Sequence, residues 1–124
     1  MEKSVKTTIE ELAKNNWRFG MYDIIFDREN NVCLNGLWSC ENDITMNEIA
    51  RKRDGKKDIE GNYKVTWIQP DNKDKDDVCI IGELVIKNMK FYYSFEWKEN
   101  GVSTYFGIGI KMNNQLIVFY LQQS

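Results

Sequence analysis

The chain of 124 residues contains no histidine, which removes the side chain most often used as a general base or a metal ligand. Carboxylates and lysines are the remaining catalytic candidates, and Glu83 and Glu96 lie in neighbouring predicted strands. The expected strand register places both on the outer face of the sheet, whereas glycosidase chemistry needs two carboxylates that flank a cleft. We therefore expect no catalytic residues and interpret the protein as a non-enzyme.

Two charged segments and three cysteines could bind ions or nucleic acid. The segment 50–57, ARKRDGKK, is basic, but acidic residues interrupt it and no aromatic side chain is present to stack on bases. The segment 70–77, PDNKDKDD, lacks the ligand order, glycine and closing glutamate of an EF-hand. Cys33, Cys40 and Cys79 have no zinc spacing. We expect no metal, no cofactor and no nucleic-acid partner.

The odd number of cysteines argues against a disulfide framework and favours reduced thiols in a cytosolic compartment. The N-terminal segment MEKSVKTTIEELAKNNW has no apolar core of a signal peptide. No stretch reaches the roughly 18 apolar residues of a membrane helix. We therefore expect a cytoplasmic protein with no membrane partner, although secretion routes that read other signals leave no visible mark in a sequence.

The composition favours strands around one core. Aromatic residues make up 13% of the chain and suit pleated surfaces, whereas alanine, the strongest helix former, is rare. The hydrophobic share of 42% is enough for a single domain over residues 1–124. Capping-box spacings predict two short helices, one in the N-terminal segment 1–16 and one around residues 45–54, inside a helical insertion at 41–60.

Strands separated by turn residues fill the rest of the chain. The predicted strands are 17–26, 32–40, 61–69, 78–86, 89–98, 102–112 and 115–122. Asn100-Gly101 and Asn113-Asn114 have the residue types of two-residue hairpin loops. We predict a mainly β fold, an antiparallel up-and-down meander closed into a small β-barrel, because closure buries the apolar face and removes the sheet edges.

The hairpin loops predict which residues face the interior. With Asn100-Gly101 as the loop, Phe95 faces Phe106 in the next strand. The predicted interior residues are Tyr63, Val65, Trp67, Ile80, Gly82, Leu84, Ile86, Phe91, Tyr93, Phe95, Trp97, Phe106, Ile108, Ile110, Ile117, Phe119 and Leu121. Gly107 and Gly109 then lie on the outer face. They could permit a sharp bend, let aromatic rings lie flat across the strands, or form a groove for the N-terminal helix or a second subunit.

Two stretches, YKVTW at 63–67 and GIGI followed by QLIVFY within 107–120, resemble the small lipocalin-like and streptavidin-like β-barrels. The similarity in strand pattern covers residues 17–122. It implies an up-and-down barrel with a ligand cavity at one mouth, and avidin-type members imply packing of barrels through outer sheet faces. The motif GLW at 36–38 comes one strand later than the opening GxW of lipocalins, so we transfer no ligand and no binding residue.

Two binding functions remain. In the first, the protein is a non-catalytic binding protein whose barrel holds an apolar or aromatic small ligand among Tyr63, Trp67, Tyr93 and Trp97. In the alternative, it is a protein–protein interaction module, either an inhibitor or a self-associating subunit that forms a homo-oligomer. The predicted interface residues are Tyr92, Tyr105, Gly107, Gly109, Val118 and Tyr120.

Overall fold

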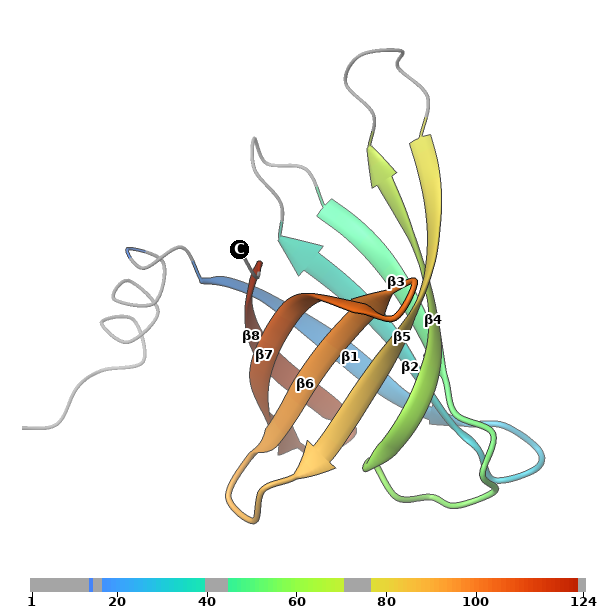
Figure 1. The fold of residues 1–124 in the computed structure, drawn as a ribbon. Coiled ribbons are helices and arrows are strands. Elements are labelled where there is room, and N and C mark those ends of the chain that lie inside the picture. The colour runs from blue at the N-terminus through green and yellow to red at the C-terminus, as the bar shows by residue number, and fades with distance from the viewer. Residues whose placement is uncertain (1–13, 15–16, 40–44, 71–76, 123–124) are drawn as a thin grey trace, which may run out of the picture.

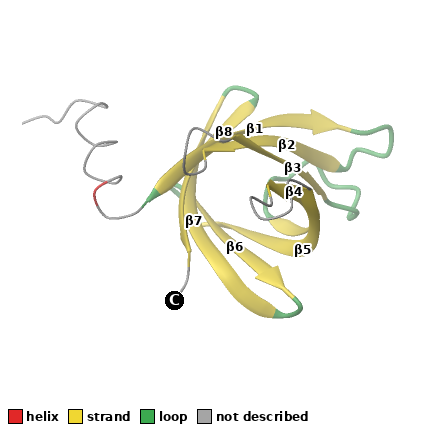
Figure 2. Ribbon diagram, turned by 90° about the horizontal axis from the view of Figure 1, so that it is seen from above, coloured by secondary structure: helices red, strands yellow, loops and turns green. Residues whose placement is uncertain are grey.

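The computed structural model describes Lys14 and residues 17–39, 45–70 and 77–122. Eight antiparallel strands follow one another in chain order, and the pairing of β1 with β8 closes the sheet into a barrel (Figures 1 and 2). The strands are β1 (Arg18–Phe26), β2 (Val32–Ser39), β3 (Thr45–Arg51), β4 (Gly61–Pro70), β5 (Asp77–Asn88), β6 (Tyr93–Glu99), β7 (Val102–Met112) and β8 (Gln115–Gln122). The predicted mainly β, up-and-down barrel is confirmed.

The predicted helix around residues 45–54 is wrong, because Thr45–Arg51 forms β3 between β2 and β4. The buried Glu48 and Ala50 alternate with the exposed Ile49 and Arg51. This is strand periodicity, but a carboxylate and a small residue occupy the inner positions while an isoleucine faces outward. The predicted N-terminal helix at 1–16 lies outside the described residues, apart from Lys14.

A register shift between Trp97 and Lys98 decides which face of β7 lies inside. Phe95 pairs with Gly107, not with Phe106 as predicted, because one extra residue is accommodated at this bulge. A one-residue slip moves every side chain of a strand to the opposite face. The pairing of β7 with β8 is the predicted one, with Gly109 opposite Val118, so both strands are inverted together.

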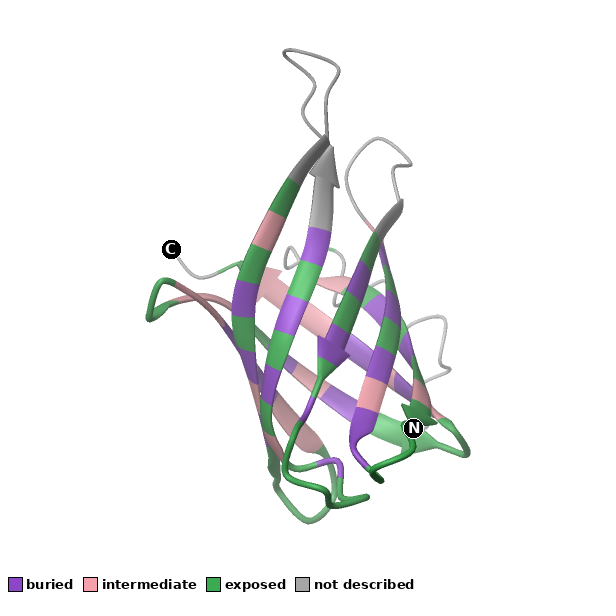
Figure 3. Ribbon diagram, turned by 90° about the vertical axis from the view of Figure 1, so that its right-hand side faces the viewer, coloured by how far each residue is buried: buried purple, intermediate pink, exposed green. Residues whose placement is uncertain are grey.

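The inversion corrects the predicted faces of the last two strands. Gly107, Gly109 and Val118 are buried in the interior. The residues predicted inside and found facing outward are Phe106, Ile108, Ile110, Ile117, Phe119 and Leu121. Phe91 was also predicted inside, but it lies in the turn between β5 and β6 and is 90% exposed. Figure 3 shows buried and exposed positions alternating along the strands.

Inward-facing glycines make room for aromatic rings. A Cβ atom built on Gly20 would lie 2.3 Å from Cε3 of Trp38, and one built on Gly109 would lie 2.7 Å from Cε1 of Phe95. The glycine–ring pairs are Gly20–Trp38, Gly36–Tyr22, Gly82–Trp67, Gly107–Trp97 and Gly109–Phe95. The rings therefore lie next to these glycines, as expected for glycines that leave space for aromatic rings, but on the inner face.

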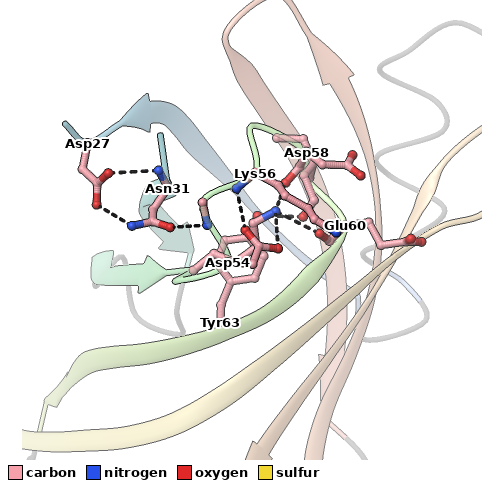
Figure 4. A network of polar contacts seen from close by, with 10 residues as sticks. Asp27, Asn31, Asp54, Lys56, Asp58, Glu60 and Tyr63 are labelled. Atoms are coloured by element: carbon pink, nitrogen blue, oxygen red, sulfur yellow. Dashed lines mark hydrogen bonds and ion pairs between the residues drawn. The ribbon is translucent and has the colours of Figure 1, made fainter. Parts of the chain in front are cut away.

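The connection from Lys52 to Glu60 joins β3 to β4 at one end of the barrel, here called the covered end, and Figure 4 shows its polar contacts. Ile59 is buried there, and so is Lys52, whose Nζ donates to the carbonyl oxygens of Asp58 and Glu60. The Asp54 carboxylate forms an ion pair with the same Nζ at 3.2 Å. The Tyr63 hydroxyl donates to the Ile59 carbonyl at 2.6 Å. A buried ammonium thus satisfies the carbonyls of a loop that has no regular structure.

The turn between β1 and β2 is tied to this connection. Asp27 accepts hydrogen bonds from the backbone and side-chain amides of Asn31, which hold the pKa of Asp27 below its usual value. The Asn31 side-chain oxygen in turn accepts from the Gly55 backbone N–H at 2.7 Å (Figure 4). These bonds tie the β1–β2 turn to the connection at the covered end of the barrel.

Gly107→Val should lower the free energy of unfolding by about 1–3 kcal/mol. Its Cβ would lie 2.8 Å from the Phe119 carbonyl oxygen and 3.1 Å from the Trp97 ring, so the core must distort. Urea denaturation measures the change. Ile108→Val, at the adjacent outward-facing position, is the matched control and should cost less than about 1 kcal/mol. Equal stabilities of the two variants would contradict the inner position of Gly107.

Candidate functional site

A carboxyl group lies inside the barrel. Glu48 of β3 is 3% exposed. The Tyr22 hydroxyl of β1 donates to its Oε2, and the Trp97 indole N–H of β6 donates to its Oε1 at 3.1 Å. The three side chains come from strands that are not neighbours in the sheet. The carboxyl therefore links separate walls of the barrel through hydrogen bonds.

Burial raises the pKa of Glu48 from 4.5 to about 8, and the hydrogen bond from Trp97 opposes this rise. The chain pays a smaller penalty for a buried neutral carboxyl than for a buried carboxylate. At neutral pH the group is therefore mainly protonated. In this form it accepts from Tyr22 and Trp97 and still carries a proton of its own to donate.

The Trp38 indole N–H is buried and has no hydrogen-bond partner among the described residues. Its Nε1 would lie 3.1 Å from a Cβ built on Gly36. Gly36 pairs with Tyr22 on one side and with Glu48 on the other. The unpaired N–H is thus on the same part of the inner wall as the buried carboxyl. A buried donor left without an acceptor costs about 1–3 kcal/mol.

Aromatic rings surround this polar group. The Trp38 ring meets the rings of Tyr22, Trp97 and Tyr120 edge to face, with centroids 5.2, 5.4 and 4.8 Å away. Trp97 also stacks on Phe95, with centroids 5.7 Å apart. Such contacts favour tight, oriented packing. Aromatic rings therefore pack around the buried carboxyl group and the Trp38 N–H.

Among the described residues, no hydrogen bond or ring contact joins the four predicted ligand residues to one another. The Trp97 indole N–H donates a hydrogen bond to Glu48. Trp67 lies opposite Glu48 in the β3–β4 register. Tyr63 lies at the covered end, bonded to Ile59, and Tyr93 is the first residue of β6 at the same end. Tyr22, Trp38 and Glu48 were absent from the predicted set. Glu48 lies within the predicted helix around residues 45–54, and that prediction concealed its inward position.

The predicted interface residues also separate. Gly107, Gly109 and Val118 are buried, so their predicted position on the outer face is wrong. Tyr105 and Tyr120 are half-buried with ring centroids 5.8 Å apart, and Tyr120 joins the ring cluster around Trp38. The Tyr120 hydroxyl donates to the Ser39 carbonyl at 2.9 Å. Tyr92 alone of the predicted set is exposed, in the turn before β6.

The outer surface carries a different apolar face, formed by β2, β1, β8 and β7. Its residues are Leu37, Phe19, Met21, Ile117, Phe119, Leu121, Phe106, Ile108 and Ile110. They are neighbours across strands, as in the row in which Ile110, Ile117, Met21 and Leu37 pair in turn. Phe19 and Leu37 are 49% and 57% exposed. No charged side chain belongs to this apolar face.

The carboxylates of the sequence analysis, Glu83 and Glu96, lie on the outer face, as predicted. Glu83 pairs with Lys64 and Lys98 on adjacent strands, along a shallow groove that Arg51 and Arg53 also line. Glu96 accepts from the Ser103 hydroxyl at 2.5 Å. The two carboxylates do not converge on a cleft.

Comparison with protein-family models, with curated proteins and with solved structures gives no match to this chain. In the part of the chain that the structure describes, no helix combines the length and apolar character needed to cross a bilayer.

Glu48 should make the protein less stable as the pH rises from about 4.5 to 8. In this window the folded protein keeps the Glu48 proton that the unfolded chain releases, so stability falls by up to roughly 1.4 kcal/mol per pH unit. Above pH 8 the loss is complete. The chain has no histidine to titrate in the same window. Urea denaturation at pH 5, 6.5 and 8 measures this slope.

Glu48→Gln is the control for that slope. The amide is uncharged at every pH and still offers an oxygen to Tyr22 or Trp97. Its stability should therefore change much less between pH 5 and pH 8. An unchanged slope in the variant would show that another group titrates.

Proposed function

We propose that the protein is a non-catalytic binding protein that associates with a second copy of itself through the outer apolar face. The observation that carries this proposal is the unbroken run of apolar side chains over four adjacent strands. The largest contiguous apolar patch on a protein surface is typically about 300–600 Å² and often marks an interaction site.

The size of the apolar face fits the centre of a dimer interface. Strands lie about 4.8 Å apart and alternate residues about 6.8 Å apart, so the face covers roughly 300 Å² in projection. A standard interface buries about 800 Å² of accessible surface on each partner, with an apolar centre and a polar rim. Asp23 and Gln115, bonded to each other at 3.0 Å, lie at one border of the face and Glu96 at another.

The chemistry of the face favours a second copy over a charged partner. It contains no charge that a partner would need to neutralise, and aromatic and methionine side chains are enriched at interface centres. A two-fold axis through the face would pack the apolar side chains of one copy against those of the other, and no charge would be buried. Flat antiparallel sheets also pack face to face about 10 Å apart. The resemblance to avidin-type barrels implies this same mode of association.

Phe119→Glu should convert a dimer into a monomer. Phe119 lies between Phe19 and Ile108 in the apolar face, and a carboxylate there would be buried without a partner. The association should weaken by at least about 30-fold. Native mass spectrometry and sedimentation velocity over a range of concentrations measure this change.

Two further variants make the test specific. Ile81→Glu places the same charge on the outer face of β5, at a side chain that is 63% exposed and outside the apolar face, and it should leave the dimer intact. Leu37→Glu, at the edge of the face, should weaken the dimer with little risk to folding. A wild-type protein that stays monomeric at high concentration would overturn the proposal.

A further inference from the structure

Trp38 Nε1 is the one buried side-chain polar atom among the described residues that lacks a hydrogen-bond partner. The other polar groups of the interior are satisfied: Tyr22 and Trp97 by Glu48, and Lys52 by backbone carbonyls. Buried polar groups in native proteins are nearly always paired. This buried donor is therefore open to an acceptor that the described residues do not supply.

The open donor lies beside other groups that can contact a ligand. Trp38 Nε1 is next to Gly36, which pairs with both Tyr22 and Glu48. Trp67 pairs with Glu48 from the following strand. Small-molecule sites commonly combine aromatic walls with a few convergent polar groups. The surroundings of the N–H therefore favour a flat, apolar molecule with one polar atom.

Trp38 lies near one end of the barrel, next to side chains that are only half-buried. Trp38 is the penultimate residue of β2, at the end opposite the Lys52–Glu60 connection. Its ring touches Tyr120, which is half-buried and in contact with the half-buried Tyr105. Trp38 is therefore in contact with half-buried rings near this end of the barrel.

We propose that the inner wall at Trp38, Glu48 and Tyr22 binds a small uncharged aromatic molecule whose carbonyl or hydroxyl oxygen accepts the hydrogen bond of Trp38 Nε1. The indole N–H is a donor only, so the ligand must supply an acceptor. A carboxylate or phosphate group is disfavoured, because the buried Glu48 would repel it whenever ionised and the site holds no described cation to compensate. This site lies inside the barrel and does not depend on the outer apolar face.

The test uses two probes of similar shape, benzamide with a carbonyl oxygen and toluene without an acceptor. Each is titrated into uniformly ¹⁵N-labelled full-length protein, and the four indole N–H resonances are followed by NMR; Trp38→Phe assigns the Trp38 signal. Benzamide should shift the Trp38 Nε1–H resonance in a saturable manner. It should bind at least tenfold more tightly than toluene, because only benzamide pairs the buried donor.

Trp38→Phe keeps an aromatic ring and removes the donor. Its affinity for toluene should stay equal or rise, while the preference for benzamide over toluene should disappear. The proposal is overturned if benzamide leaves the Trp38 resonance unmoved at 10 mM, if toluene binds equally well to the wild type, or if an ordered water alone occupies the N–H in a crystal soaked with benzamide. Should the variant not fold, the wild-type comparison of the two probes decides alone.

Discussion

The bulge between Trp97 and Lys98 is the constraint on which the rest of the barrel depends. Side chains alternate strictly along a strand, so one extra residue at this point selects which half of β7 and β8 enters the core. With the bulge, glycines face the rings of Phe95 and Trp97, and isoleucine and phenylalanine face outward. Both the dense aromatic interior and the apolar outer face follow from that single shift in register.

Glu48 links the packing of the interior to the bulge between Trp97 and Lys98. Its hydrogen bonds reach Tyr22 and Trp97, and Trp97 is the residue at which the register changes. A buried carboxyl with two donors is costly to assemble, since each partner must be in place to satisfy it. Such a group specifies one packing of the walls over alternatives that would leave it unpaired. The inner site and the sheet register therefore support each other.

Much of the architecture could be predicted, and the errors have identifiable causes. Asn100 and Gly101 both have a left-handed φ, as the hairpin prediction requires. The β7–β8 pairing likewise follows from the turn residues and from the alternation of side chains. No local signal marked the bulge, because it is a property of how β6 pairs with β7 at Trp97 and Lys98 and not of the turn residues. β3 was mistaken for a helix because its inner residues are Glu48 and Ala50, which do not show the apolar alternation of a strand. Sequence rules fail most at such polar inner positions, and here those positions hold the candidate site.

In each glycine–ring pair, the size of one side chain limits the size of the other. A side chain at Gly20 or Gly36 has room only if the ring opposite becomes smaller, and a smaller ring leaves a void only a larger neighbour can fill. In homologous barrels, a larger residue at the glycine position should therefore occur together with a smaller residue at the ring position. Covariation between a glycine on one strand and an aromatic on the next would then be the mark of this interior in distant sequences.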